Sequence, residues 1–418
     1  MFVKIWTEIS RVRLAGNFAA LRRVLAAVDN KKSGLPATEL LAVVKANAYG
    51  HGIDPCAAVL AKAGAEWLGV TDTVEGAEVR RVLAIAGIPE AEQPKVLVMC
   101  GTAGLPGEAE GVLRHRLTPV VWSLNHLERL AEAVRPAGPG AVVDVHLEID
   151  SGMSRQGVRS GEDLTAILDA ISKEPGLKLG GVFTHFASTE VFHSTQTAVQ
   201  QAEFEAAIAQ IAAAGMKSEW VHVGNSSYID NGHEGSKSLI WLRKVAARLE
   251  ARAMVRSGLG LYGYFLPLEG RDESLAAGQV LPVMTWKTRV IGISEIPADA
   301  AVGYSATFVT KRPMRLALLA AGYADGLRRE LSSTNAEPGG WAMIHGQRAA
   351  IIGRVSMNLV SVDVSEIEDV GEGDEAVLLG EGVTADDHAR LAGTIAYEIL
   401  CGVRTSASPA FAHIRSGR

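Results

Sequence analysis

Short apolar runs that alternate with helical sequence are the feature that most limits how this chain can fold. They are too short for helices and rich in Val and Leu, which is typical of strands buried on both faces. All but the last are clearly followed by helical sequence, and eight such units predict a (β/α)8 barrel of the TIM type. A doubly wound open sheet competes, but no GxGxxG motif follows the first run. The runs are Leu40–Lys45, Trp67–Val70, Lys95–Cys100, Thr118–Trp122, Val142–Ile149, Gly181–Phe186, Trp220–Val223 and Ala253–Val255.

The second part of the chain has the sequence pattern of a mainly β domain. Glycine and proline residues between 266 and 278 mark a connector, and helical spacing returns only over 384–400. We therefore expect an α/β fold in two domains, an N-terminal barrel over residues 9–270 and a C-terminal, mainly β domain over residues 278–418. The runs expected as strands of the second domain are Met284–Val290, Val302–Phe308, Arg315–Leu319, Trp341–His345, Arg348–Gly353, Val360–Val364 and Glu375–Leu379.

Composition excludes several classes of protein. Hydrophobic residues make up 48% of the chain and charged residues 21%, as in ordinary globular proteins, and the net charge of −6 favours neither nucleic acid nor membrane as a partner. No apolar stretch is long enough to cross a bilayer, and the start lacks the features of a signal peptide. Three widely spaced cysteines indicate reduced thiols, so we expect a cytoplasmic protein. None of the eleven histidines forms a ligand-spaced cluster, so no metal site is expected.

The first apolar run carries a single lysine, Lys45, at its end. A lysine is costly to bury as a cation, so it should either emerge there or be chemically altered. A Schiff base with an aldehyde cofactor would alter it, whereas a snorkelling side chain is the alternative. This pattern alone leaves both open. Shortly after, Asp54 as N-cap and Pro55 as the first helical residue predict the start of a helix.

Two loops later in the barrel have the composition of phosphate sites. In such barrels, phosphate commonly binds after the seventh and eighth strands. The loops there, His222–Ser227 and Arg256–Gly260, offer small residues, hydroxyls and backbone amides. With Lys45 on the first strand, they outline a site for pyridoxal phosphate.

The sequence resembles the alanine racemases in several stretches. The stretch Val44–Gly52 is similar to the cofactor-lysine signature of that family, and Ala321–Gly326, which reads Ala-Gly-Tyr-Ala-Asp-Gly, is also quite specific. Less specific matches occur in the family's order over nearly the whole chain. They are Gly152–Arg155, Thr184–Phe186, Asn225–Ser226, Val255–Gly258, Leu261–Gly263, Val302–Tyr304, Gly353–Met357 and Tyr397–Cys401.

The resemblance implies racemisation of L- and D-alanine on pyridoxal phosphate, supplying D-alanine for peptidoglycan. It implies two catalytic bases on opposite faces of the substrate, Lys45 and Tyr323. It also implies a homodimer in which Tyr323 and Met357 complete the partner's site, with residues 1–8 joining the β domain. A phenol ordinarily keeps its proton at neutral pH, so Tyr323 needs a cationic neighbourhood, which we expect to include His185 and Arg256.

The resemblance also assigns roles around the cofactor. Arg256 would face the pyridine nitrogen and, being always protonated, would leave that nitrogen an acceptor, which disfavours transamination and decarboxylation. Arg155 would approach both the cofactor's phenolic oxygen and the substrate carboxylate. Tyr49 would donate to the phosphate. The remaining implied residues are His185, Asn225, Ser226, Gly258 and Leu259 for the cofactor, Met357 and Tyr304 for the substrate, and His222 in support.

Two departures from the family pattern bear on function. Glu148 stands where many members have a carbamylated lysine, and we hypothesise that it holds Arg155 in place. Thr405 falls about where a pocket tyrosine is usual, which predicts tolerance of larger substrates such as serine. A broad-specificity amino-acid racemase is therefore the first alternative. A decarboxylase of the same fold and a non-catalytic cofactor carrier are the others. The long segment 228–252 has no role that the sequence indicates.

Overall fold

The computed structural model describes residues 3–28, 35–138, 140–231, 237–270 and 274–405. The chain divides into two compact units. The first comprises residues 14–48 and 52–281, and the second comprises residues 1–13, 49–51 and 282–418. None of the helices in the described ranges is long and apolar enough to cross a membrane.

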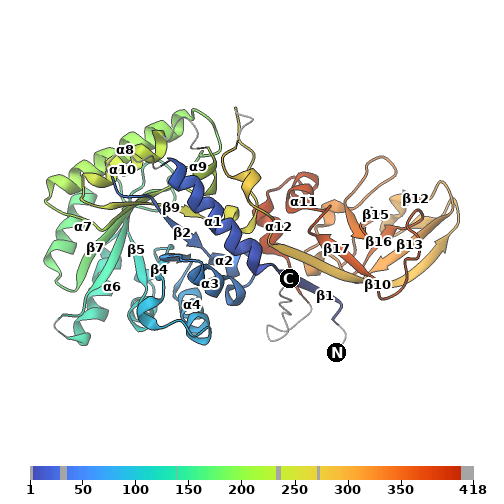
Figure 1. Cartoon of the computed structure of the whole chain (residues 1–418), viewed down its shortest axis with the longest axis horizontal. Coiled ribbons are helices and arrows are strands. Elements are labelled where there is room, and N and C mark those ends of the chain that lie inside the picture. The colour runs from blue at the N-terminus through green and yellow to red at the C-terminus, as the bar shows by residue number, and fades with distance from the viewer. Residues whose placement is uncertain (1–2, 29–34, 139, 232–236, 271–273, 406–418) are drawn as a thin grey trace. The chain divides into compact units, whose positions relative to one another are not determined.

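Eight parallel strands form a closed barrel in the unit that contains residues 14–48 and 52–281 (Figure 1). The strands are β2 (Glu39–Val43), β3 (Trp67–Val70), β4 (Lys95–Val98), β5 (Thr118–Val121), β6 (Val143–Glu148), β7 (Leu177–Phe183), β8 (Trp220–Val223) and β9 (Arg252–Ser257). The first barrel strand, β2, pairs with both its neighbour β3 and the last barrel strand, β9, which closes the ring. The predicted fold class is confirmed.

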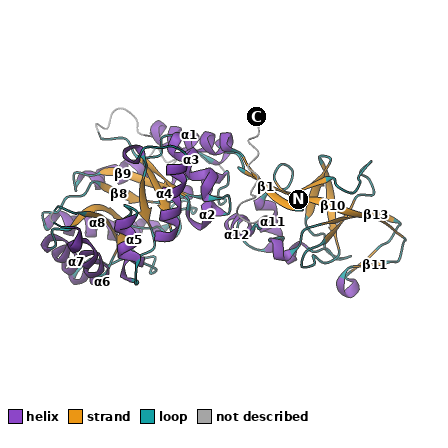
Figure 2. Cartoon of the chain, turned by 90° about the horizontal axis from the view of Figure 1, so that it is seen from below, coloured by secondary structure: helices purple, strands orange, loops and turns teal. Residues whose placement is uncertain are grey.

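Helices lie on the outside of the barrel strands (Figure 2). Several begin at a side chain that accepts a backbone N–H, as Asp72 does for α4, Ser123 for α6 and Ser194 for α8. The main helices are α1 (Arg11–Val28), α3 (Ile53–Lys62), α4 (Thr73–Ile85), α5 (Glu108–Arg114), α6 (Leu124–Val134), α7 (Glu162–Lys173), α8 (Thr195–Ala213), α9 (Ser226–Asp230) and α10 (Lys237–Ala247).

Two local predictions in the barrel were wrong. Asp54 does not cap α3, because that helix already begins at Ile53 with Gly52 as its N-cap, and Pro55 lies within its first turn. The strand expected at Gly181–Phe186 begins earlier, at Leu177, because the register with β6 extends back along both strands.

The other unit is built on a seven-stranded, mainly antiparallel sheet in the order β1-β10-β13-β16-β15-β14-β17. Strand β1 (Ile5–Ile9) pairs with β10 (Met284–Ile296). The other strands of this sheet are β13 (Met314–Leu319), β14 (Trp341–Ile344), β15 (Gln347–Ile352), β16 (Val360–Asp363) and β17 (Glu375–Leu379).

The strand predicted at Val302–Phe308 is wrong, because a 3-10 turn (Tyr304–Ala306) separates two-residue strands β11 (Ala301–Val302) and β12 (Phe308–Val309). The helical prediction over 384–400 is confirmed as two helices, α11 (Ala385–Ala392) and α12 (Ala396–Gly402). Thr384 and Asp387 form a capping box at the start of α11.

Candidate active site

Lys45 emerges at the carboxyl end of β2 and begins a short left-handed turn, α2 (Lys45–Tyr49). The four residues after the lysine, Ala46 to Tyr49, all have φ between 53° and 55°. None is glycine, and left-handed helical conformation costs an L-residue roughly 1–2 kcal/mol. A run of this kind persists only where its surroundings impose it, and such strain is typical of functional sites.

Glu75 on α4 holds this turn through backbone contacts. One carboxylate oxygen accepts the N–H of Asn47 (3.0 Å) and the other accepts the N–H of Thr71 (2.8 Å). The side chain of Asn47 then accepts the N–H of Ile53 (3.0 Å), so the turn is tied to the first residue of α3. These bonds offset part of the strain and fix where the lysine side chain leaves the backbone.

The electrostatic surroundings of Lys45 make its amine easier to deprotonate than that of an ordinary lysine. The side chain reaches solvent, but partial withdrawal of the ammonium from water lowers its pKa, and the positive charges of Arg155 and Arg256 lower it further. A neutral amine is the form that attacks an aldehyde carbon. The sequence left a snorkelling cation as the alternative, and a cofactor-bearing lysine stays a prediction.

Arg256, at 4% exposure, is held by two histidines and a carbonyl. Its Nη1 donates to His222 Nδ1 (2.9 Å), and its Nη2 donates to Thr184 O (2.9 Å) and His185 Nδ1 (3.1 Å). Burial lowers the pKa of Arg256 to about 10, so it stays charged at neutral pH. A guanidinium only donates hydrogen bonds, so both histidines accept through Nδ1 and carry their proton on Nε2.

The chain of hydrogen bonds continues one residue further. His222 Nε2 donates to Nδ1 of His146 (2.9 Å), and both rings are fully buried. Burial and the charge of Arg256 lower the pKa of His185 to about 3 and that of His222 well below its usual range. The expectation that His185 adds positive charge near Tyr323 is therefore wrong, because His185 is neutral at ordinary pH. Of the two residues expected to supply positive charge, Arg256 alone is a cation.

The two predicted phosphate loops come together in the structure. The hydroxyl of Ser226 accepts the N–H groups of Gly258 (3.3 Å) and Gly260 (3.0 Å) and lies 3.0 Å from the hydroxyl of Ser257. Asn225 accepts the N–H of Tyr228 (3.1 Å) and so caps α9, whose first N–H groups have no intrahelical acceptor. Leu259 is fully buried, and its predicted contact with the cofactor stays a prediction.

Glu148 is buried, and it lines one small cavity together with Arg155, Gln156 and His185. Gln156 Nε2 donates to its Oε2 (2.9 Å). Burial raises the pKa of Glu148 to about 7, against the opposing effects of Arg256, Gln156 and Arg155. Glu148 thus acts on both arginines through its charge, while its direct hydrogen bond comes from Gln156. That it holds Arg155 in place remains a prediction.

The other predicted site residues belong to the unit with the antiparallel sheet. Tyr323 N donates to Ser356 O (3.0 Å), and Ala324 N donates to Met357 O (2.9 Å), so Tyr323 and Met357 lie on adjoining segments. The side chains of Tyr304 (69%), Met357 (56%) and Tyr323 (44%) are largely exposed.

Tyr49 is grouped with that unit as well. It is buried, with its ring centroid 5.8 Å from that of Tyr397. Its predicted contact with phosphate stays a prediction, as does the role of Thr405, which is half-buried just beyond α12. In the described ranges, no three His, Cys, Asp or Glu side chains are grouped so that they could hold a metal ion.

The sequence did not indicate three residues that support the site. Glu75 and Gln156 act through backbone or carboxylate contacts that no motif marks. His146 had a detectable signal, because it sits two positions before Glu148 on a predicted strand and so points to the same side as that residue.

The chain matches two family models along most of its length. One, described as "Alanine racemase, N-terminal domain", matches residues 17–265, and the other, described as "Alanine racemase, C-terminal domain", matches residues 283–409. The chain belongs to the alanine racemase family.

Alanine racemases are also its relatives over whole chains. A protein of that name from Syntrophobacter fumaroxidans is 33% identical over 402 residues, which is 95% of this chain and 95% of that protein. One from Halothermothrix orenii is 33% identical over 95% of this chain and 94% of its own length. The alanine racemase structure from Streptomyces coelicolor A3(2) is 28% identical with a TM-score of 0.80, covering 96% of each chain. That from a D-cycloserine-producing Streptomyces lavendulae is 30% identical with a TM-score of 0.79, covering 96% of this chain and 95% of that one.

Proposed function

We propose that this protein interconverts L- and D-alanine on pyridoxal phosphate carried by Lys45. Membership of the alanine racemase family establishes the reaction, and the family depends on this cofactor. The observation that carries the assignment to Lys45 is its place at the end of a barrel strand, where burial and the charges of Arg155 and Arg256 also lower the pKa of its amine.

The residues present fit pyridoxal phosphate. Lys45 supplies an amine for its aldehyde, and the joined loops supply the hydroxyls of Ser226 and Ser257 for a phosphate, while the N–H groups of Gly258 and Gly260 already donate to Ser226. Asn225 and Leu259 belong to the same loops, and Tyr49 is our further candidate for the phosphate. When bound, the cofactor withdraws electrons from the α-carbon and so makes the α-proton easier to remove.

Arg256 favours return of the proton over other reactions. It stays charged because its pKa of about 10 lies above neutral pH, and its neighbours His185 and His222 are neutral. A ring nitrogen facing such a donor remains an acceptor, which keeps the electron sink weak. A decarboxylase would be better served by a carboxylate at this position.

The second base would be Tyr323 of another copy of the chain. Racemisation needs acid/base groups on two faces of the substrate, and Lys45 can serve only one. The exposed side chains of Tyr323, Met357 and Tyr304 are available to a partner subunit. We therefore propose a homodimer in which these residues complete the partner's site, and Arg155 binds the substrate carboxylate.

We further propose that the protein works in the cytoplasm and supplies D-alanine for peptidoglycan. Thr405 in place of a pocket tyrosine favours a second candidate function, racemisation of serine and other substrates larger than alanine.

The test is an assay of both enantiomers. Purified protein with pyridoxal phosphate should abolish the optical rotation of L- and D-alanine with exchange of the α-proton and without release of carbon dioxide, and Lys45→Ala should lose both activity and the bound cofactor's absorbance. Carbon dioxide release would establish a decarboxylase, and bound cofactor without exchange would establish a carrier. A panel that includes serine decides substrate breadth.

A further inference from the structure

Gln200 is a buried polar residue on an otherwise apolar helix face. The buried residues of α8 are Gln200, Phe204, Ala207, Ile208 and Ile211, spaced as one side of a helix. Gln200 is only 1% exposed. A primary amide in such a place is costly unless its hydrogen bonds are made, so its contacts show what it does.

The amide of Gln200 holds the backbone on both sides of Phe186, in the loop after β7. Its Oε1 accepts the N–H of Ala187 (2.9 Å), and its Nε2 donates to the carbonyl of His185 (3.0 Å). An N–H can only donate and a carbonyl can only accept, so these two bonds fix which way the amide faces. Gln200 therefore sets the position of the backbone from which the His185 ring projects toward Arg256.

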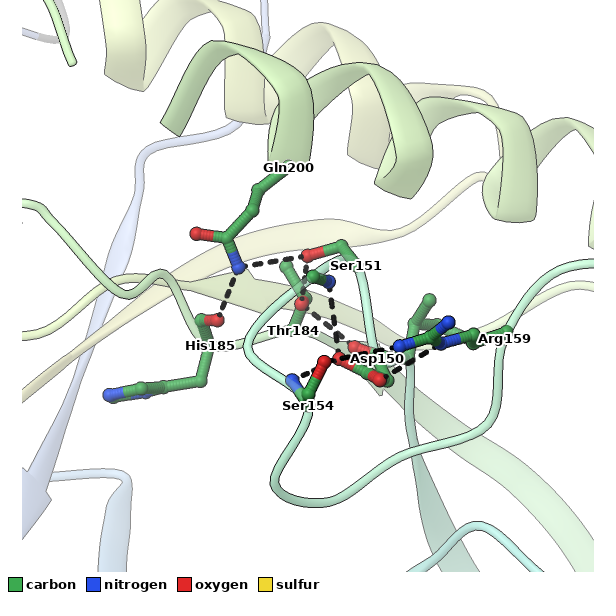
Figure 3. Close-up of polar contacts among 9 residues, drawn as sticks. Asp150, Ser151, Ser154, Arg159, Thr184, His185 and Gln200 are labelled. Carbon is green, nitrogen blue, oxygen red and sulfur yellow. Dashed lines mark hydrogen bonds and ion pairs between the residues drawn. The ribbon is translucent and has the colours of Figure 1, made fainter. Parts of the chain in front are cut away.

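The same amide also reaches the loop after β6, which carries Arg155. Nε2 donates a second hydrogen bond, to Ser151 Oγ (3.4 Å) (Figure 3). The Thr184 hydroxyl donates to Ile149 O (2.8 Å). The Ser151 hydroxyl, whose oxygen lies 2.7 Å from Thr184 Oγ1, must therefore donate to Thr184. The result is a buried chain with a fixed direction, from Gln200 through Ser151 and Thr184 to the end of β6.

The start of the Arg155 loop is tightened from its other side as well. Asp150 Oδ1 accepts the N–H groups of Gly152 (3.1 Å) and Ser154 (2.9 Å), and Arg159 pairs with Oδ2 (3.2 Å) (Figure 3). A Cβ on Gly152 would lie 3.4 Å from Cγ of Gln200, so the stem of the glutamine packs directly on this loop. Gln200 thus contacts both loops, by hydrogen bonds and by packing.

We propose that Gln200 is a positioning residue, which holds His185 and the loop of Arg155 in their places at the active site. The inference rests on the proposed function, because it concerns the arrangement of residues that the reaction would use. The chain offers a matched control on the same helix. Gln210 makes three hydrogen bonds of the same kind, to Gly161 N (2.9 Å), Gly161 O (2.7 Å) and Thr165 Oγ1 (2.8 Å), at the start of α7.

The test compares Gln200→Met with Gln210→Met in protein loaded with pyridoxal phosphate. Each substitution removes three hydrogen bonds and keeps a side chain of similar length, so both should lower the thermal midpoint. Only Gln200→Met should lower kcat, by about tenfold or more, because small displacements of aligned groups are costly in rate. It should also change the absorption spectrum of the bound cofactor and that spectrum's dependence on pH, since Arg256 and His185 lie at the site.

Ser151→Ala is the second variant, because it cuts the link to Thr184 and leaves the bonds to the β7 loop intact. It should raise KM for alanine more than it lowers kcat, since Arg155 is the group displaced. The inference is overturned if Gln200→Met matches Gln210→Met in kcat and spectrum, or, should Gln200→Met not fold, if Ser151→Ala matches the unsubstituted protein. A parent protein that neither binds the cofactor nor racemises alanine would instead refute the proposed function.

Discussion

Glu148 should reduce the stability of the folded protein at neutral pH, although it is a native residue. Glu148 is only 3% exposed, and burial raises the pKa of its carboxyl from 4.5 to about 7 despite the nearby positive charges of Arg256 and Arg155. In the unfolded chain the carboxyl titrates at its ordinary value. Between these two pH values the folded state binds more protons than the unfolded state, so the free energy of unfolding falls as pH rises.

The size of this effect follows from the two pKa values of Glu148. A shift of this size corresponds to about 3 kcal/mol, which is present below pH 4.5 and lost once pH has risen through 7. A glutamine at this position stays neutral and can still accept from Gln156. Glu148→Gln should therefore match the parent protein near pH 4.5 and exceed its stability by up to about 3 kcal/mol at pH 8.

Urea unfolding of the cofactor-free protein at about pH 5 and pH 8 measures this difference. Glu203→Gln is the control, because Glu203 is exposed on α8 and its replacement should change stability little at either pH. The reasoning is refuted if Glu148→Gln changes the free energy of unfolding equally at the two pH values, or if the variant is the less stable one at pH 8.

The stability gained by Glu148→Gln should be accompanied by a loss of function. Arg155 and Arg256 would lose a nearby negative charge, so substrate binding or turnover should weaken while the protein becomes more stable. If cofactor affinity, alanine affinity and turnover were all unchanged, the hypothesis that Glu148 supports Arg155 would fail.

Three further predictions concern other groups of the site. The lowered pKa values of His146, His185 and His222 mean that the unfolded chain takes up protons first, so stability should fall as pH drops below about 6.5, by up to roughly 4 kcal/mol per pH unit. NMR signals assigned to these three histidines that titrate near pH 6.5 in the folded protein would contradict this. Glu75→Gln replaces one of two carboxylate oxygens, which accept from Asn47 in the left-handed turn and from Thr71, and should cost about 1–3 kcal/mol in urea unfolding and weaken cofactor binding; unchanged values would show that the turn is held otherwise. Thr405→Tyr should lower kcat/KM for serine more than for alanine, and an equal change for both would remove Thr405 as a determinant of specificity.

The barrel was predictable because its signal is periodic. The eight runs are short and apolar, and all but the last are clearly followed by helical sequence. Burial on both faces leaves little else for such a pattern to form. The strand wrongly predicted at Val302–Phe308 shows the limit of reading strands from apolar runs. Ser305 (φ 62°) and Ala306 (φ 47°) turn the chain there, and neither serine nor alanine predicts a positive φ from sequence.

The site was predictable as a set of residues but not as a network. The turn after Lys45 adopts left-handed conformation without glycine, so its geometry depends on Glu75 from another helix. His185 was expected to be cationic, because a sequence does not show how deeply a ring is buried or which of its nitrogens accepts from an arginine. Gln200 lies on the buried face of α8, although a glutamine in a sequence usually indicates an exposed position.

The most direct test of the account is the exchange of the α-proton for deuterium in the Tyr323→Phe variant, followed separately with L- and D-alanine in heavy water. If Lys45 and Tyr323 serve opposite faces, the variant should lose interconversion and retain exchange for one enantiomer only, while Lys45 still binds the cofactor. Continued interconversion, or equal loss of exchange for both enantiomers, would contradict the two-base assignment.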